Sequence, residues 1–169
     1  MGMELDFEID KITESIENAE TGESLDTLVL PVTKADFEVV TKKNGWLFDW
    51  KQEFYEPEHQ VYKLVTEQEP HTIQGLVSLK KMVDYVFMSL IESAPCNRGK
   101  GKKYLGVCGN LTAFGCKLSM EYGFGGVISF ISKTALISHY EKTLGAVHLG
   151  GNIMAIFEPN AQNLINNYF

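Results

Sequence analysis

A basic, glycine-rich turn that leads into a long apolar segment constrains this chain more than any other stretch. It spans residues 95–123, PCNRGKGKKYLGVCGNLTAFGCKLSMEYG. The first half places lysines and the chain's only arginine, Arg98, among closely spaced glycines, and the second half has the apolar periodicity of a helix. Small residues at a helix start allow free backbone N–H groups and the positive end of the helix dipole to face an anion. The stretch therefore predicts a phosphate-binding turn in front of a helix.

Size and charge favour one globular domain with an acidic N-terminal arm. The chain has 169 residues, of which 44% are hydrophobic and 22% are charged, which is enough for one real core. Residues 1–26 hold nine acidic side chains and one lysine, a net charge of −8, which leaves +1 for the rest of a chain whose total is −7. We expect a single domain over residues 1–169, made of the arm (1–26) and a core (27–169).

The same features narrow the partners and the compartment. A nearly neutral body argues against nucleic acid as the principal partner, because phosphate-backbone binding usually shows as a basic face over a whole domain. The acidic N-terminus does not resemble a signal peptide, and no run approaches the roughly 18 apolar residues of a membrane span. Three cysteines without CxxC spacing indicate a reducing, cytoplasmic compartment. No pair of His, Cys or carboxylate side chains has metal-ligand spacing, so we expect no metal.

The remaining periodicity predicts an ordered series of strands and helices. Residues 4–10 alternate apolar and acidic side chains, as a half-exposed strand does, and Asp10 is placed to cap a short helix that ends at Gly22. Three β-rich runs predict an antiparallel meander, and the strand after the long helix should be parallel to the strand before it. The expected core elements are a strand over 27–32, a helix over 33–43, strands over 60–66, 72–79 and 84–93, a helix over 109–122, a strand over 125–131, a helix over 134–144, a hairpin over 146–149 and 152–158, and a short C-terminal helix.

This order of elements resembles the GNAT family of acyl-CoA-dependent N-acyltransferases over nearly the whole chain from Thr27. The resemblance implies an α/β (α+β) fold with a central mixed, mostly antiparallel sheet flanked by helices. In that family the turn follows the pattern Gln/Arg-x-x-Gly-x-Gly/Ala, and its backbone N–H groups bind the pyrophosphate of coenzyme A. Two segments are similar to this pattern: residues 98–103, with Lys103 where Gly or Ala belongs, and residues 103–108, with a lysine in the first position.

Helix propensity favours the second segment. A helix that began just after Lys103 would carry Gly106 and Gly109 in its first two turns, at a cost of about 1 kcal/mol each relative to alanine. If residues 103–109 are the turn itself, these glycines are what allows phosphates to approach. Residues 97–102 (NRGKGK) then form an inserted basic loop near another phosphate of the coenzyme. Taken alone, the turn is equally compatible with a plain strand-to-helix connection whose lysines are solvated.

A tyrosine provides the second point of resemblance. Tyr140, in SHYEKTLGA, is similar to the family's Tyr-Glu-Lys-x-Gly segment, in which the tyrosine protonates the leaving thiolate. A phenol with a pKa of about 10 can give a proton to a thiolate of similar basicity; the alternative is an aromatic side chain that packs on the core. Glu92, at the end of the strand before the turn, is the candidate general base, and a solvated carboxylate is its alternative. The coenzyme-binding residues that the resemblance implies, for acetyl-CoA or another acyl-CoA, are Leu90, Ile91, Ser93, Lys103, Tyr104, Leu105, Gly106, Val107, Cys108, Gly109 and Lys133.

Several positions depart from the family's pattern. Lys133 stands where many members have an asparagine, and Cys108 replaces Gly or Ala in the turn. We interpret Cys108 as a small residue with a steric role rather than as a covalent acyl carrier, because the family transfers the acyl group directly. His139 and His148 are further titratable candidates, although lone histidines beside a helix and a hairpin are more often structural.

The resemblance also places an acceptor site. The aromatic stretch GWLFDWKQEFYEPEHQ occupies the region that walls this site in the family, so Trp50, Glu53 and Tyr55 are the candidate contacts to a small-molecule or peptide amine. We therefore expect an N-acetyltransferase that transfers an acetyl group to a primary amine by direct attack, with a homodimer as an allowed oligomeric state. Two alternatives stay open: a catalytically inactive coenzyme A-binding sensor or interaction module, and a nucleic-acid contact through RGKGKK.

Overall fold

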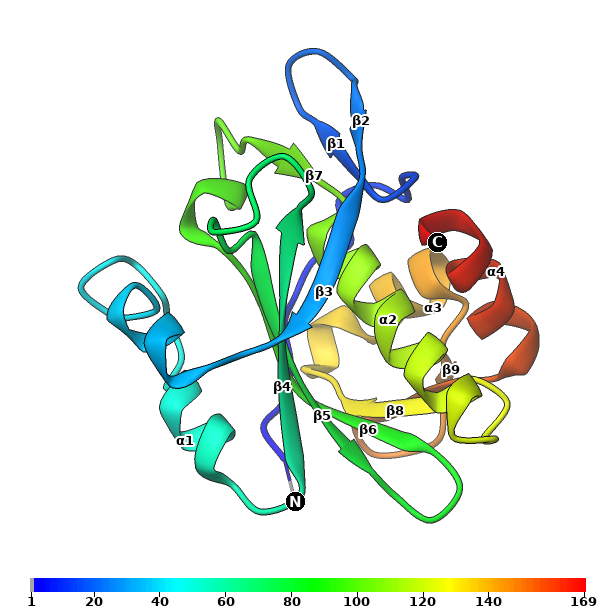
Figure 1. The fold of residues 1–169 in the computed structure, drawn as a ribbon. Helices are drawn as coiled ribbons and strands as arrows, with labels where there is room; N and C mark the ends of the chain where they lie inside the picture. The colour runs from blue at the N-terminus through cyan, green and yellow to red at the C-terminus, as the bar shows by residue number, and fades with distance from the viewer. Residues whose placement is uncertain (1) are drawn as a thin grey trace.

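A seven-stranded mixed sheet forms the centre of the computed structural model, which describes residues 2–169 (Figure 1). The strand order is β3-β4-β5-β6-β8-β10-β9, and every neighbouring pair is antiparallel except β6 and β8. This is the mixed, mostly antiparallel sheet that the sequence predicts. The strands are β3 (Thr27–Pro31), β4 (His59–Thr66), β5 (Gly75–Lys81), β6 (Val86–Ser93), β8 (Ile128–Ile131), β9 (Val147–His148) and β10 (Ile153–Ile156).

Helices cover both faces of this sheet. Two of them, α2 (Val107–Glu121) and α4 (Glu158–Tyr168), lie side by side on one face, and α1 (Trp50–Tyr55) lies on the other (Figure 1). Because both faces are covered, β6 is buried at every position except Ser93. A further helix, α3 (Ile137–Leu144), follows the 3-10 turn η3 (Thr134–Leu136). None of the helices within residues 2–169 is long and apolar enough to cross a membrane.

The parallel strands β6 and β8 pair only where they begin. Val86 lies opposite Ile128 and Phe87 lies opposite Ser129, and the pairing ends there. α2 connects the two strands, as the sequence predicts for parallel neighbours. Beyond Phe87 the strands diverge, and within the described part of the chain residues 88–93 pair only with β5. One edge of β6 is therefore left without a partner strand.

A β-bulge interrupts β6 at Ser89. Ser78 pairs with Leu90 and Leu79 pairs with Met88, so Ser89 has no opposite residue on β5. A bulge inserts one extra residue, which breaks the regular alternation of side chains between the two faces and re-aims those beside it. The Ser89 hydroxyl accordingly reaches α1, where it donates a 2.8 Å hydrogen bond to Glu53 Oε1.

The N-terminal arm contains no helix within residues 2–26, so the predicted helix capped by Asp10 is wrong. Ser15 has a left-handed φ of 54°, which interrupts any helical path. The chain then enters a second, three-stranded sheet of order β2-β1-β7, in which Glu17 and Asn18 pair with Leu105 and Tyr104, far away in the sequence. Long-range strand pairing thus outweighs a weak local helical pattern. The strands of this sheet are β1 (Ile16–Asn18), β2 (Ser24–Leu25) and β7 (Tyr104–Leu105).

The helix predicted over residues 33–43 is reduced to one 3-10 turn, η1 (Lys34–Glu38). The Asp36 carboxylate accepts a 2.8 Å hydrogen bond from the backbone N–H of Thr33 and binds Lys63 Nζ at 2.8 Å, which ties the turn to β4. After it, the Asn44 side chain donates to the carbonyl of Val39, and this bond stabilises a reversal of the chain. These side-chain contacts offer the backbone an alternative to a continuous helix.

Candidate functional site

The N-terminus of α2 is formed as the second of the two candidate turns predicts. The helix begins at Val107, directly after Gly106, whose φ of 88° is accessible mainly to glycine. The first intrahelical bond runs from the N–H of Asn110 to the carbonyl of Gly106, so the N–H groups of the first turn point out of the helix end. Gly109 lies inside this helix rather than in the turn. An added Cβ there would overlap the Tyr168 hydroxyl, so this glycine allows α4 to approach α2.

The inserted basic loop over residues 97–102 is anchored at its start. It follows the 3-10 turn η2 (Pro95–Asn97), and the buried side chain of Asn97 accepts a 3.0 Å hydrogen bond from the N–H of Tyr104. The N–H of Tyr104 is therefore already paired with a side chain of the protein, and this bond connects the turn to the start of the loop. Further along the loop, Lys102 Nζ lies 3.1 Å from Asp10 Oδ2, so the arm neutralises one of the loop's cations.

The end of β6 brings Ser93 close to the turn, and Glu92, which lines the same cavity as Ser93 and Cys108, is held by other protein groups. Ser93 Oγ lies 3.2 Å from Cys108 Sγ in the first turn of α2. The Glu92 side chain is buried and accepts 2.8 Å hydrogen bonds from Trp50 Nε1 and from the backbone N–H of Leu47. Arg98 Nη1 lies 3.7 Å from the same carboxylate. These partners engage both oxygens of Glu92 and favour a structural role, while its role as a base stays a prediction.

Tyr140 lies on α3 with its hydroxyl against the arm. Its side chain is fully buried, its ring stacks on Phe7 with centroids 4.5 Å apart, and its hydroxyl donates a 2.7 Å hydrogen bond to the carbonyl of Phe7. Burial raises the pKa of this phenol well above its usual range, so the hydroxyl is protonated at neutral pH. A protonated phenol is the form that a general acid requires.

Cys108 is a buried thiol in the first turn of α2. Burial raises its pKa to about 12, so almost none of it is thiolate at neutral pH. The thiolate is the nucleophilic form of cysteine. This is in keeping with the steric role predicted for Cys108, which stays a prediction.

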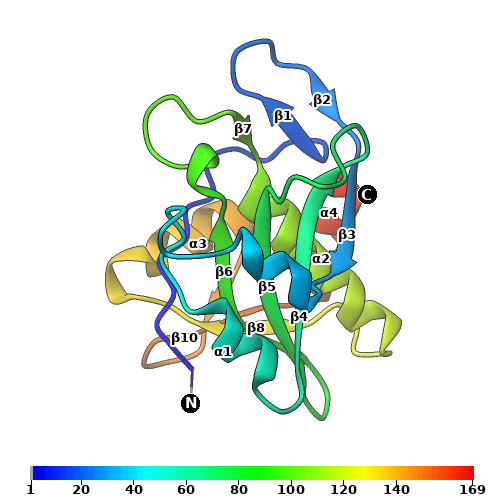
Figure 2. The ribbon, with the colours of Figure 1, turned by 60° about the vertical axis from the view of Figure 1, so that its left-hand side comes forward.

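The arm runs from the end of β8 to the start of α2, and Figure 2 shows it as the dark blue segment that rises past α3 to β1. Leu5 forms a parallel bridge with Ser132, donating a 2.7 Å hydrogen bond to Ile131 and accepting a 2.9 Å bond from the N–H of Lys133. The Asp6 carboxylate lies 2.8 Å from Lys133 Nζ, and this pair is half exposed. Asp10 Oδ1 accepts a 3.0 Å hydrogen bond from the N–H of Gly106.

Two cavities flank the free edge of β6. The first, of about 470 Å³, is lined by Phe87, Ser89 and Leu90 of β6, by Phe48 and Glu53, and by further polar side chains, namely Asp49, Gln52, Glu56, His59 and Lys80. The second, of about 260 Å³, lies between the arm and the end of β6, and its lining includes Ile91, Ser93, Asp10, Lys102 and Cys108. Phe48 lines both cavities, which places them next to each other along the strand.

The predicted acceptor residues separate in the structure. Glu53 lines the larger cavity, where its Oε1 lies 3.5 Å from His59 Nδ1 and accepts the hydrogen bond from Ser89. Trp50 is buried in the core and does not line this cavity, and Tyr55, at 62% exposure, also lies outside its lining. Of the three, only Glu53 therefore lines this cavity.

The two candidate histidines both contact backbone groups. His139 Nε2 accepts a 3.0 Å hydrogen bond from the N–H of Ile9, and His148 lies 2.7 Å from the carbonyl of Gly151 on the β9–β10 connection. Within residues 2–169, no cluster of three or more His, Cys, Asp or Glu side chains could hold a metal ion.

Sequence reasoning missed the arm's contribution to this site. Phe7 accepts a hydrogen bond from Tyr140, and Asp10 accepts one from Gly106. The residues of each pair lie about a hundred positions or more apart in the chain. The available signal was the alternation over residues 4–10, which the structure confirms: Leu5, Phe7 and Ile9 are buried, and the acidic residues between them are exposed. Ser89 binds Glu53 and His59 lies beside it, but neither residue belongs to a sequence motif that would have indicated a role in this site.

Comparison with solved structures identifies the fold. Spermidine N-acetyltransferase from Vibrio cholerae, in a dodecameric structure, superposes with a TM-score of 0.58 at 14% identity over 82% of this chain and 97% of its own. The ribosomal-protein-S18-alanine N-acetyltransferase from Escherichia coli gives 0.56 at 13% identity, over 77% and 92% of the two chains. AtaTR bound with AcCoA gives 0.56 at 12% identity, over 82% and 98%.

These similarities lie in structure and not in sequence. No protein-family model matches the chain, and no curated protein matches its sequence. The protein has the fold of the GNAT N-acetyltransferases, as the order of elements and the turn at Gly106 predict.

Proposed function

We propose that the protein is an acyl-CoA-dependent N-acyltransferase that transfers an acetyl group from acetyl-CoA to a primary amine. The observation that carries this proposal is the free edge of β6, which runs past two cavities and ends beside the N-terminus of α2. Structural neighbours with this fold include enzymes named as N-acetyltransferases for spermidine and for an alanine of a ribosomal protein, and one neighbour is bound with AcCoA.

We place the coenzyme in the cleft between β6 and the start of α2, where the second cavity is lined by Ile91, Ser93 and Cys108. Alternate residues of a strand present their backbone groups to the same edge, and Ala94 donates to Gln74 on the β5 side. Ile91 and Ser93 would therefore pair with the pantetheine chain, whereas the backbone of Leu90 faces β5. The N–H groups of Gly106 and of the first turn of α2 would bind the pyrophosphate, because the positive end of a helix favours anions. The coenzyme supplies the acyl group as an activated thioester. The cations that complement its phosphates are Lys102, Lys103 and Lys133.

We place the amine acceptor in the first cavity, which Glu53 lines. This cavity presents the carboxylates of Asp49, Glu53 and Glu56 and one lysine, Lys80, so its charge favours a cationic amine. Glu53 is held by Ser89 and lies beside His59, and it is the carboxylate of this cavity that contacts β6 directly. We assign it the role of accepting the proton that the ammonium group must lose before attack.

Tyr140 is assigned the role of general acid. Its raised pKa keeps the hydroxyl protonated, and the hydroxyl bonds to Phe7, which lines the cavity at the end of β6. The nitrogen of a primary ammonium group loses two protons in forming the amide: the first passes to Glu53 before attack, and the second, lost as the amide forms, restores the Tyr140 hydroxyl after Tyr140 has protonated the departing thiolate. Backbone N–H groups on the free edge of β6 are the donors available to the developing oxyanion.

An acetyl-transfer assay with Glu53→Gln tests the assignment. We expect the wild type to release free coenzyme A thiol with a cationic amine, and the variant to lose about a hundredfold in kcat/KM with unchanged affinity for acetyl-CoA. Glu58→Gln is the matched control, because Glu58 is a nearby carboxylate with 74% side-chain exposure outside the cavity. Equal losses in both variants, or none in either, would contradict the role of Glu53.

A second candidate function is a coenzyme A-binding module without catalysis. The specific observation that favours it is the complete engagement of Glu92 and of the Tyr140 hydroxyl by protein groups. Measuring binding and turnover separately distinguishes the two functions. Binding of acetyl-CoA by calorimetry, with no acyl transfer to any member of a panel of polyamines and peptides, would support the module and exclude the enzyme.

A further inference from the structure

We propose that residues 4–13 of the N-terminal arm act as an internal competitor of acyl-CoA, so that the coenzyme binds only when this segment leaves the cleft. The inference rests on the proposed function, because it concerns regulation of the same site. It is carried by four contacts, each of which ties the arm to a group that the coenzyme or the reaction would use.

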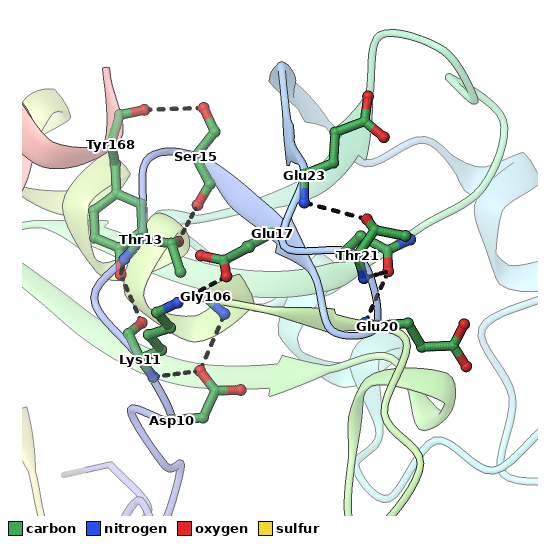
Figure 3. Close-up of polar contacts among 11 residues, drawn as sticks. Asp10, Lys11, Thr13, Ser15, Glu17, Glu20, Thr21, Glu23, Gly106 and Tyr168 are labelled. Carbon is green, nitrogen blue, oxygen red and sulfur yellow. Dashed lines mark hydrogen bonds and ion pairs between the residues drawn. The ribbon is translucent and has the colours of Figure 1, made fainter.

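Two of these contacts place carboxylates of the arm where phosphates are expected. Asp10 accepts a 3.0 Å hydrogen bond from the N–H of Gly106 (Figure 3) and also lies 3.1 Å from Lys102 Nζ, so it neutralises the helix end and the basic loop together. Asp6 lies 2.8 Å from Lys133 Nζ. A carboxylate and a phosphate cannot share one anion site at close range, because like charges repel.

The other two contacts engage the reaction end of the cleft. The carbonyl of Phe7 accepts the hydrogen bond of the Tyr140 hydroxyl at 2.7 Å, so the candidate acid cannot reach a thiolate while the arm is in place. The backbone of Leu5 pairs with Ile131 and Lys133, at the edge where β8 has diverged from β6. The arm thus occupies the splayed part of the sheet from the Tyr140 end to the helix end.

A purely structural strap does not require this pattern of charge. Burial of Leu5, Phe7 and Ile9 would be enough to hold such a strap without any partner for its intervening acidic residues. Instead, Asp6 and Asp10 are matched to cations and to a helix N-terminus. The coenzyme binds only those molecules whose arm has left the cleft. Its apparent Kd is therefore its intrinsic Kd divided by the fraction of molecules in that state.

The structure also contains a hinge for this movement. Ser15 is one of two described non-glycine residues with positive φ, and directly after it β1 is anchored to β7. Before it, the contacts of Tyr168 with the arm backbone are long, at 3.3 Å to the carbonyl of Lys11 and 3.5 Å to the N–H of Thr13 (Figure 3). Residues 4–13 can therefore swing away while the β1–β2 hairpin stays in place.

Hydrogen exchange on the unmodified protein tests the inference. Peptides covering residues 4–13 should exchange slowly in the free protein, because the N–H groups of Leu5 and Ile9 are hydrogen-bonded. Saturating acetyl-CoA should accelerate exchange in these peptides and slow it in peptides covering residues 104–110. If acetyl-CoA binds and the arm keeps or gains protection, the arm is a wall of the site and the inference is overturned, with the proposed function intact.

A pair of variants adds a quantitative readout. Asp10→Ala should lower the Kd for acetyl-CoA by about tenfold, because it frees the Gly106 N–H and Lys102. Glu14→Ala removes the same charge from an exposed position with no side-chain hydrogen bond or ion pair within residues 2–169, so it should change the Kd by less than about twofold. Equal effects of the two variants would overturn the inference. If neither the wild type nor Asp10→Ala binds acetyl-CoA, the proposed function fails and the inference falls with it.

Discussion

The indole of Trp50 donates a 2.8 Å hydrogen bond to the buried carboxylate of Glu92, and this bond joins α1 to the end of β6. The same carboxylate also accepts from the backbone N–H of Leu47, so one acidic side chain holds two segments of the β3–β4 connection against the sheet. A buried carboxylate that satisfies two N–H groups is costly to replace, because its loss leaves buried donors without acceptors.

Glu92→Gln should therefore destabilise the protein. The amide offers one acceptor oxygen in place of two, which leaves one N–H group facing an NH₂ group, and we expect a loss of about 1–3 kcal/mol in the free energy of unfolding. Urea denaturation measures this loss, with Glu58→Gln as an exposed control that should change stability by less than about 0.5 kcal/mol. A stable Glu92→Gln protein with a lowered kcat would instead return Glu92 to the role of general base.

The orientation of Glu92 shows where sequence reasoning reaches its limit. The meander, the parallel pair β6–β8 and the helix after Gly106 follow from local periodicity and glycine placement, and the structure confirms them. The face on which a strand residue lies follows from alternation, and a single bulge at Ser89 breaks that alternation. Nothing in the residues around Ser89 marks the bulge, so the partners of Glu92 could not be predicted.

The arm was beyond prediction for a different reason. Its alternating pattern correctly indicates one buried and one exposed side, but Asp10 and Gly106 are 96 positions apart and Phe7 and Tyr140 are 133 apart. A single sequence carries no information on which groups meet over such separations. The resemblance to the GNAT family begins at Thr27, so it also gave no position for the segment before it.

Gly106→Ala should cost more stability than Gly99→Ala. Both glycines have positive φ, 88° and 67°, so each substitution carries a left-handed penalty of about 1–2 kcal/mol. An added Cβ at Gly106 would also overlap the Thr13 side chain, whereas no atom of residues 2–169 lies within 4 Å of one at Gly99. Thermal unfolding should separate the two variants by at least about 1 kcal/mol. In a Thr13→Ala background the difference should shrink, and an unchanged difference would show that Thr13 is not its cause.

The three cysteines should differ sharply in reactivity. Cys96 is exposed, whereas burial raises the pKa values of Cys108 and Cys116 to about 12. At pH 8 a thiol with a pKa of about 12 is ionised only to about one part in 10⁴, so it should react about a thousandfold more slowly than an ordinary cysteine. Intact-mass analysis with N-ethylmaleimide should show one fast label on the native protein and three after denaturation. Rapid labelling or acylation of Cys108 in the native protein would support the acyl-carrier alternative.

Tyr140→Phe should affect turnover and coenzyme affinity in opposite directions. Loss of the hydroxyl removes the proposed acid, so kcat for acyl transfer should fall by about a hundredfold. The same change removes the donor to the Phe7 carbonyl, which weakens the hold of the arm, so the Kd for acetyl-CoA should stay unchanged or decrease. Tyr168→Phe is the matched control, because Tyr168 is also buried and its hydroxyl also contacts the arm, but at Lys11 and Thr13 rather than at Phe7. It should loosen the arm without lowering kcat. Equal falls in kcat for both variants would mean that Tyr140 acts through packing, and the role of general acid would have to be abandoned.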